Sequence, residues 1–256
     1  MKIALIGYGK MGHIIERIAL ERGHEIVSKV DVDNQDEFES EAFASADVAI
    51  EFTIPAKAVE NYRKAWAAGV PVVSGTTGWN SVLPELKEEI AAKGYTLFWA
   101  SNFSLGVNLF FELNKRLAQM MNRYANYDVA MTEIHHTEKK DAPSGTAITL
   151  AEGILENLDR KSEWVLCNSQ FTIHNSQTNE REDVKCDKSQ LSIEAVREGK
   201  VPGTHIVKYD SAVDTITIMH EAKSREGFAL GAVVAAEFLV GKPTGFYSMA
   251  DLMNEE

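Results

Sequence analysis

The stretch KIALIGYGKMG, residues 2–12, decides the fold class of this chain. Residues 2–6 form a short apolar run that is typical of a buried strand, and residues 11–22 carry apolar side chains at helical spacing. Where the two segments meet, Gly7, Gly9 and Gly12 form a GxGxxG pattern. In a dinucleotide-binding turn the first glycine makes the tight turn, the second lets the backbone approach a pyrophosphate, and the third lets helix and strand pack closely. The stretch predicts such a turn; the alternative is a glycine turn in an α/β domain that binds no nucleotide.

Short apolar runs and helical patterns alternate over the first hundred residues. Further strands are expected at 25–31, 47–52, 70–74 and 95–100, with helices at 55–68 and 81–92. This β-α-β alternation predicts a parallel sheet with helices on both faces. Because crossovers between parallel strands are right-handed, a Rossmann-type doubly wound sheet is the expected topology.

The pattern changes after residue 104. A long helix is expected at 105–124, with an apolar stripe that includes Leu109, Leu113, Leu117, Met120, Met121 and Tyr124. A strand at 127–136, a helix at 144–158 and a strand-rich stretch at 163–222 follow; its apolar segments are WVLC 164–167, FTIH 171–174, LSIEAV 191–196, THIVKY 204–209 and DTITIMH 214–220. We therefore expect a dinucleotide-binding domain at 1–104, joined by the helix-bearing segment 228–256. An α+β domain with an open mixed sheet is expected at 105–227.

Composition excludes several classes of protein. The 256 residues include 26 Lys plus Arg and 38 Asp plus Glu, a formal net charge of −12, which argues against a general nucleic-acid binder. No apolar run reaches the roughly 20 residues that span a bilayer, and the N-terminus lacks the apolar region of a signal peptide. Two cysteines cannot make a disulfide framework, so reduced thiols and a cytoplasmic location are expected.

An acidic segment follows the second expected strand and bears on the choice of cofactor. Asp31 lies 19 positions after Gly12, where an acidic residue typically binds the adenosine ribose hydroxyls. The segment from Asp31 to Glu41 contains six acidic residues, both ends included, and no Lys or Arg occurs between Lys29 and Lys57. A 2′-phosphate would be repelled there, so NADH is expected to be preferred over NADPH, with Lys10 the one nearby cation. The alternative for Asp31 is an ordinary solvated strand end.

A second cluster of reactive residue types lies in EIHHTEKKDAPSGT, residues 133–146. Histidines suit proton transfer near neutral pH, lysines attract an anionic substrate, and the helix start at Ser144 offers backbone N–H groups to a carboxylate. The alternative is a strand edge, a charged loop and a Ser-capped helix without a site. A zinc site is less favoured, because adjacent histidines on a strand diverge and no third ligand is obvious nearby.

Several motifs together give a resemblance that covers nearly the whole chain. They are GYGKMG 7–12, EFT 51–53, GTTG 75–78, SNFSLGVN 101–108, EIHHTEKKDAPSGTA 133–147 and the HEAKSREGFALGAV region 220–234. The chain resembles the dihydrodipicolinate reductase family, to which the EIHHxxxKxDAPSGT run is very specific. The family usually has DFT where this chain has EFT. Many members carry an Arg after the acidic residue of the second strand, where this chain has Val32.

The resemblance implies roles for individual residues. It implies that His135 and Lys139 are catalytic in proton transfer, and that His136, Gly145 and Thr146 bind the substrate. It implies that two stretches lie along the nicotinamide half of the cofactor: Gly75, Thr76 and Thr77, and Ala100, Ser101, Asn102 and Phe103. The expected cofactor-binding set is completed by Gly7, Tyr8, Gly9, Lys10, Met11, Gly12 and Asp31.

The resemblance also implies an activity, the NAD(P)H-dependent reduction of 4-hydroxy-tetrahydrodipicolinate to tetrahydrodipicolinate in diaminopimelate and lysine biosynthesis. The implied partners are the cyclic imine dicarboxylate substrate and further copies of the chain in a homotetramer formed through the sheets of the second domain. Nucleic acid, membrane and metal are not expected. The alternatives are a non-catalytic Rossmann-type redox sensor and another two-domain NAD-dependent reductase, such as an aspartate or inositol dehydrogenase.

Overall fold

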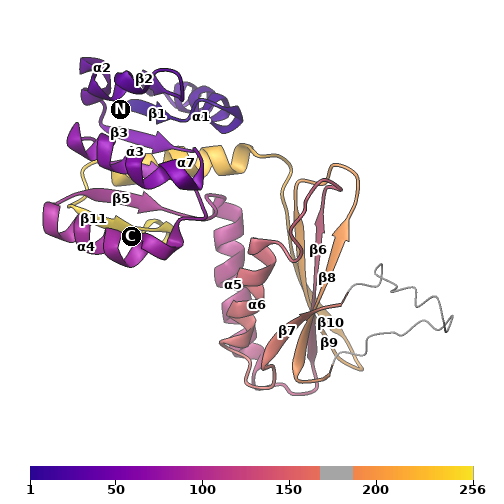
Figure 1. The fold of residues 1–256 in the computed structure, drawn as a ribbon. Helices are drawn as coiled ribbons and strands as arrows, with labels where there is room; N and C mark the ends of the chain where they lie inside the picture. Colours follow the sequence, from indigo (N-terminus) through magenta and orange to yellow (C-terminus); the bar gives the residue numbers. More distant parts are fainter. Residues whose placement is uncertain (168–186, 256) are drawn as a thin grey trace, which may run out of the picture. The chain divides into compact units, whose positions relative to one another are not determined.

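A computed structural model describes residues 1–167 and 187–255 of the chain. The described residues form two compact units, one made of Met1–Leu105 with Glu226–Glu256 and the other of Gly106–Arg225. The helices and strands of both are labelled in Figure 1. Among the described residues, no helix is long and apolar enough to cross a membrane.

The first unit contains a six-stranded parallel sheet. Its strands are β1 (Lys2–Ile6), β2 (Glu25–Val30), β3 (Val48–Glu51), β4 (Val72–Ser74), β5 (Thr96–Trp99) and β11 (Gly245–Tyr247), in the order β11-β5-β4-β3-β1-β2. Its helices are α1 (Lys10–Glu21), α2 (Glu41–Ala44), α3 (Pro55–Ala67), α4 (Leu83–Lys93), α7 (Glu226–Leu239) and α8 (Met249–Met253), with short 3-10 turns at Gln35–Glu39 (η1) and Asn80–Val82 (η2). The predicted Rossmann-type sheet is confirmed.

A separate hydrophobic core lies on each face of this sheet. One core joins Ile3 and Leu5 of β1 with residues of α1 and α7, such as Ile15 and Val233. The other joins Ala4 and Ile6 with Tyr62 of α3 and Leu86 of α4. Alternate residues of β1 point to opposite faces, and all of residues 3–6 are buried, so this part of the strand is a continuous apolar run. The layering places the carboxyl ends of β1, β3 and β4 at one edge, where ligands of open α/β sheets bind.

The second unit is a mixed five-stranded sheet with helices on one face (Figure 1). Its strands are β6 (Asp128–His135), β7 (Glu163–Leu166), β8 (Gln190–Arg197), β9 (Thr204–Asp210) and β10 (Thr215–Glu221), in the order β10-β9-β6-β8-β7. The pairs β10–β9 and β9–β6 are antiparallel, while β6–β8 and β8–β7 are parallel. Helices α5 (Leu105–Met121) and α6 (Gly145–Leu155) pack on this sheet. Phe110 of α5 and Leu150 of α6 share a hydrophobic core with Met131 of β6 and Val207 of β9.

The face of α5 that packs inward follows the apolar stripe of the sequence only in part: Met121 is buried and Leu117 packs against the core. Its buried residues are Val107, Phe110, Asn114, Ala118 and Met121. Four members of the predicted stripe are exposed: Leu109, Leu113, Met120 and Tyr124. Apolar residues occur on more than one face of this helix, so spacing alone does not select the inner face. The polar Asn114 is buried because its side-chain amide donates to the Leu150 carbonyl at 2.9 Å.

Two other expectations concern the segment after β7. The expectation of reduced thiols is wrong for Cys167, which is disulfide-bonded. Cys186, the other cysteine of the chain, and the predicted strand at 171–174 lie outside the described residues.

Candidate active site

Two of the three glycines in the turn after β1, Gly7 and Gly12, have no room for a side chain. A Cβ at Gly7, whose φ is +90°, would lie 2.2 Å from the Phe52 carbonyl oxygen, and a Cβ at Gly12 would lie 2.5 Å from that of Gly7. Gly9 caps α1 without a side-chain hydrogen bond to the helix, and a Cβ there would meet open space. The backbone N–H groups at the start of α1 therefore face an open space that suits the phosphates of a dinucleotide.

A cavity of about 450 Å³ adjoins this turn. Its lining combines predicted cofactor residues from the loops after β1 and β4 with residues of the loop after β3: Gly9, Lys10, Met11, Phe52, Thr53, Pro55, Gly75, Thr76 and Thr77. Gly75 is required here, because a Cβ would lie 2.3 Å from the Phe52 ring. The structure thus brings six of the predicted residues together, and the glycines and open backbone fit a dinucleotide cofactor.

Phe52 and Thr53 were not among the predicted site residues. The signal for them was the EFT motif, which places them directly after a buried strand, as Gly75 follows β4. The predicted segment from Ala100 to Phe103 follows β5, and the Ala100 N–H donates to the Ser74 carbonyl at 3.3 Å. The Phe103 ring lies 5.8 Å from that of Phe52, so this segment packs against the cavity wall.

Asp31 lies directly after β2, and Tyr8 lies in the glycine turn after β1. One carboxylate oxygen of Asp31 accepts the Val32 N–H at 2.9 Å. Lys29, the nearest preceding cation, is paired with Glu16 at 2.6 Å and also donates to the Tyr8 hydroxyl. The Glu16 pair neutralises Lys29, so this end of the sheet offers little positive charge to a 2′-phosphate.

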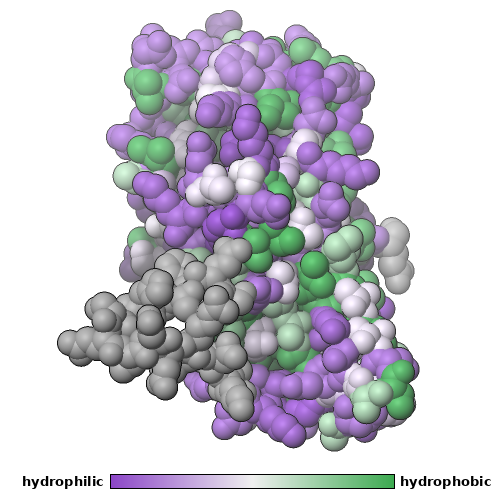
Figure 2. Space-filling view, turned by 90° about the vertical axis from the view of Figure 1, so that its right-hand side faces the viewer, coloured by the Kyte–Doolittle hydropathy of each residue, from purple (hydrophilic) through white to green (hydrophobic). Residues whose placement is uncertain are grey.

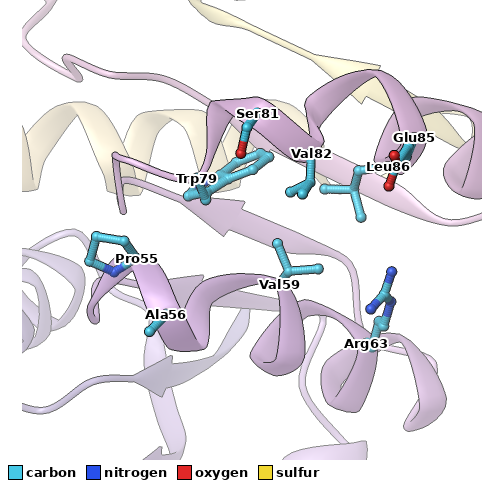
Figure 3. A pocket seen from close by; sticks show the side chains of 9 residues that line it. All are labelled: Pro55, Ala56, Val59, Arg63, Trp79, Ser81, Val82, Glu85 and Leu86. Atoms are coloured by element: carbon cyan, nitrogen blue, oxygen red, sulfur yellow. The ribbon is translucent and has the colours of Figure 1, made fainter.

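A second hollow of about 420 Å³ lies between α3 and the η2–α4 segment, with Pro55, Val59, Trp79 and Leu86 on its walls (Figure 3). Its one cationic side chain, Arg63, is paired with Glu89 at 2.8 Å. None of the predicted site residues lines it, so we assign it no part in the chemistry.

In the second unit, His135 and Glu133 lie on the same face of β6. His135 Nδ1 is 2.8 Å from Glu133 Oε2, and both side chains are buried. The other Glu133 oxygen accepts from Arg197 of β8 at 2.9 Å and from the Ser144 N–H at 3.1 Å. Burial acts to raise the pKa of Glu133, but the bonds from His135, Ser144 and Arg197 outweigh it and lower the pKa to about 2. His135 is therefore held by a fixed anion that orients its ring.

His205 of β9 completes the surroundings of His135. The two rings are 5.2 Å apart in an edge-on arrangement, and His205 Nε2 lies 3.2 Å from the Ser144 hydroxyl. Burial lowers the pKa of His205 to about 4, so it is neutral at pH 7. Gly203 leaves room for His135, because a Cβ at 203 would lie 2.9 Å from His135 Nε2.

Glu133, His135 and His205 form a buried group whose side chains are of metal-ligating types, with one ligand atom of each within 4.8 Å of the others. Arg197 already pairs with the carboxylate of this group. A bound cation would compete with the guanidinium for Glu133, so the arrangement suits a proton-transferring histidine better than a metal centre.

Lys139 lies in the loop after β6 and pairs with both carboxylate oxygens of Asp141 at 2.8 Å. Arg197 donates to the Asp141 backbone carbonyl at 2.6 Å, so one guanidinium ties the lysine loop to Glu133. Hydrogen bonding from Lys139 lowers the pKa of Asp141. The loop thus holds a charged amine on the same strand end as His135.

The three predicted substrate-binding residues lie beside this loop. Ser144 caps α6 by accepting the Ala147 N–H at 3.2 Å, and Gly145 and Thr146 form the first turn. A Cβ at Gly145 would meet open space, so a ligand can approach the backbone there. His136 directly follows β6 and is half-buried. In the second unit, the residues around His135 that were not among the predicted site residues are Glu133, Arg197 and His205.

Two family models match almost all of the chain. The model described as dihydrodipicolinate reductase, N-terminus, matches residues 1–103, and that described as dihydrodipicolinate reductase, C-terminus, matches residues 106–253. The chain belongs to the dihydrodipicolinate reductase family. This membership confirms the resemblance that the six motifs between residues 7 and 234 indicated.

Curated relatives extend this match over the full length. The chain is 46% identical to 4-hydroxy-tetrahydrodipicolinate reductase from Christiangramia forsetii over 257 residues, covering 100% of this chain and 98% of the relative. It is 41% identical to the enzyme of the same name from Methanopyrus kandleri, covering 81% of this chain and 71% of the relative.

Solved structures show the shared fold. A dipicolinate-bound dihydrodipicolinate reductase from Paenisporosarcina sp. TG-14 matches with a TM-score of 0.70 at 21% identity, covering 97% of both chains. A myo-inositol dehydrogenase from Corynebacterium glutamicum matches with a TM-score of 0.54 at 14% identity, covering 96% of this chain and 90% of the other. The architecture is therefore common to several dehydrogenases, and sequence distinguishes the dihydrodipicolinate reductases among them.

Proposed function

We propose that this chain is a 4-hydroxy-tetrahydrodipicolinate reductase of diaminopimelate and lysine biosynthesis. It forms tetrahydrodipicolinate and uses a nicotinamide cofactor. The single observation that carries the proposal is His135, oriented by ionised Glu133, at the same strand end as Lys139. A Rossmann-type redox sensor would have no need of this second-unit constellation.

The residues of the second unit supply the proton and bind the substrate. The cofactor, when bound, supplies a hydride to the substrate ring. His135 and Lys139 deliver a proton and stabilise the negative charge that develops toward the ring nitrogen. Gly145 and Thr146 offer backbone N–H groups at the start of α6 to a substrate carboxylate, which His136 also binds. Glu133 keeps the His135 ring in one orientation during this transfer.

For the cofactor, we propose that Gly7, Gly9, Gly12 and the first turn of α1 hold the pyrophosphate, and that Asp31 binds the adenosine ribose. The paired state of Lys29 and the exposure of Val32, where many family members have an Arg, support a preference for NADH over NADPH. Lys10 is the cation that would moderate this preference.

For assembly, we propose a cytoplasmic homotetramer formed through the helix-free face of the second sheet. Register places Thr132, Ile206 and Met219 in one row across β6, β9 and β10 on that face, and Met219 is 58% exposed. Beside the grey residues in Figure 2, hydrophobic and neutral residues are interspersed with polar ones on this side of the second unit. A sheet face with this mixture suits pairing with another copy of the chain.

The test is steady-state turnover with NADH and with NADPH on freshly generated 4-hydroxy-tetrahydrodipicolinate. We expect reduction with both cofactors and a larger kcat/KM with NADH. Absence of turnover with either cofactor, in protein that binds NADH, would favour the redox sensor. A clear advantage for NADPH would overturn the cofactor preference alone and point to Lys10 as a phosphate ligand.

A further inference from the structure

A single arginine contacts two parts of the second unit that carry the proposed proton donors. Arg197 is the last residue of β8, and register pairs it with His135 of β6. Its Nη2 group donates to Glu133 Oε1 at 2.9 Å and to the Asp141 backbone carbonyl at 2.6 Å. Because each terminal nitrogen of a guanidinium carries two N–H groups, Nη2 can make both bonds at once. The two bonds join β8 to the central strand β6 and to the loop that follows it.

The bond to Glu133 leads to His135. Glu133 Oε1 binds the guanidinium, and Glu133 Oε2 lies 2.8 Å from His135 Nδ1. Burial acts to raise the pKa of Glu133, but its partners lower the pKa to about 2, so this carboxylate is ionised at pH 7. A guanidinium in a protein is always charged. The contact therefore joins two full charges, and the anion beside His135 is held in place from β8.

The bond to Asp141 leads to Lys139. Lys139 Nζ pairs with both carboxylate oxygens of Asp141 at 2.8 Å. This pair joins two residues of one loop, so on its own it moves with the loop and does not fix the amine relative to His135. The Arg197 bond to the Asp141 carbonyl supplies the missing attachment, because it comes from a strand of the sheet.

The two proposed proton donors act on one buried neighbour. Burial is the largest cause of the lowered pKa of His205, about 4, and the charges of His135 and, more weakly, Lys139 add to it. The loop between the two donors is also closed against the turn after β8, because the Thr137 N–H donates to the Gly199 carbonyl at 3.3 Å. His135 and Lys139 are therefore close enough to act on one substrate.

We propose that Arg197 is a positioning residue that holds His135 and Lys139 in the arrangement that proton delivery requires. The proposal rests on the proposed function, in which both groups act on the same substrate. Arg197 donates no proton itself, because a guanidinium is not deprotonated in proteins. Its effect on His135 passes through Glu133, and its effect on Lys139 passes through Asp141. Such an effect matters because a misplacement of about 1 Å can cost about a hundredfold in rate.

Two substitutions separate the two branches. Arg197→Met removes both bonds and keeps the apolar stem. Each lost branch should cost about tenfold, the usual coupling within one hydrogen-bond network, so we expect kcat to fall by about a hundredfold. Arg197→Lys keeps a cation beside Glu133, but the lysine chain ends short of Nη2 and loses the bond to the Asp141 carbonyl. Its kcat should fall by about tenfold.

The test measures kcat of both variants in the wild-type and the Lys139→Ala backgrounds. With no amine left to position, Arg197→Met should cost only about tenfold in the Lys139→Ala background, and Arg197→Lys should cost almost nothing there. Arg160→Met is the matched control. Arg160 also donates to two backbone carbonyls of the second unit, those of Met121 at 3.1 Å and Tyr127 at 2.9 Å, and its loss should leave kcat near that of the wild type.

Hydrogen exchange adds a measurement that needs no turnover. The Thr137 and Lys139 amides of the loop donate to the carbonyls of Gly199 and His136. In Arg197→Met these two amides should exchange about tenfold faster than in the wild type, because the loop has lost its side-chain attachment to β8. In Arg160→Met their exchange should be unchanged.

Several outcomes would overturn the proposal. They are an equal fold-loss of kcat from Arg197→Met in the two backgrounds, the same loss in Arg160→Met, or unchanged exchange of the loop amides. If Arg197→Met does not fold, Arg197→Lys decides, and an equal loss in the two backgrounds would contradict the proposal. Wild-type protein that binds NADH but fails to reduce the substrate refutes the proposed function only, because the exchange measurement still shows whether Arg197 holds the loop.

Discussion

Replacing Glu133 by glutamine should weaken both the stability and the chemistry of the second unit. The carboxylate lies 2.8 Å from His135 and 2.9 Å from Arg197, and its side chain is 1% exposed. Glutamine retains the shape but leaves the Arg197 guanidinium without its anion. An uncompensated charge at a buried site is strongly destabilising.

The magnitude follows from the pKa of Glu133, which falls from an ordinary 4.5 to about 2 in the folded protein. A lowered pKa stabilises the fold above the unfolded value and loses that contribution as pH falls through the folded value. The difference corresponds to about 3 kcal/mol at pH 7, of which about 1 kcal/mol remains at pH 3. We therefore expect the wild type to exceed Glu133→Gln in unfolding free energy by these amounts.

Urea unfolding followed by circular dichroism at pH 7 and pH 3, at matched ionic strength, measures this difference. Glu138→Gln, which removes an exposed acid from the following loop, is the control and should change stability by less than about 0.5 kcal/mol. We also expect kcat of Glu133→Gln to fall, because the His135 ring loses its orienting partner. A stability difference that is the same at both pH values would refute the reasoning, as would a variant with wild-type kcat.

Three further substitutions test other parts of the structure. Lys139→Ala should lower kcat by about 10²–10⁴-fold, whereas Lys140→Ala, one residue further along the loop, should stay near wild type; equal behaviour of the two variants would remove Lys139 from the mechanism. Gly203→Ala should lower kcat, because its Cβ would lie 2.9 Å from His135 Nε2 and its φ is +153°; wild-type turnover would contradict the placement of His135. Ile206→Glu, on the helix-free face of the second sheet, should reduce the mass measured by light scattering from that of a tetramer toward that of one chain, and an already monomeric wild type would refute the proposed assembly.

Local signals in the sequence were sufficient to predict most of the strands and helices of the first unit. The strand–turn–helix at residues 2–22 and the alternation up to residue 99 depend on neighbouring residues, so the five strands and the longer helices could be predicted from their own composition, whereas η1 and α2 were not predicted. Strand β11 could not be predicted, because the three residues Gly245–Tyr247 are too few to show alternation. The inner face of α5 could not be chosen either, since burial there depends on the sheet against which the helix packs.

The partners of His135 show a different limit of sequence reasoning. Glu133 lies two residues before His135 on an expected strand, and the two-residue period of a strand places both side chains on one face. This period could have identified Glu133 as a partner of His135. Arg197 and His205 could not be found in this way. They reach the site through strand register, which pairs His135 with Arg197 across β6–β8 and Glu133 with His205 across β6–β9. Register between strands some 60 residues apart in the chain is not contained in local composition.

The return of the chain to the first unit has a consequence for the order of folding during synthesis. Helix α7 supplies much of one face of the first core, and β11 supplies an edge of its sheet, yet both follow residue 225. The second unit is continuous in sequence from Gly106 to Arg225, so a ribosome releases all of it while the first unit still lacks these elements. The nascent chain therefore carries an uncovered apolar sheet face until residues 226–247 have emerged, and this is the interval in which a chaperone would find a binding surface. A released chain truncated after residue 225, which contains all of the second unit but lacks α7 and β11, should accordingly be more sensitive to protease within residues 1–105 than within residues 106–225.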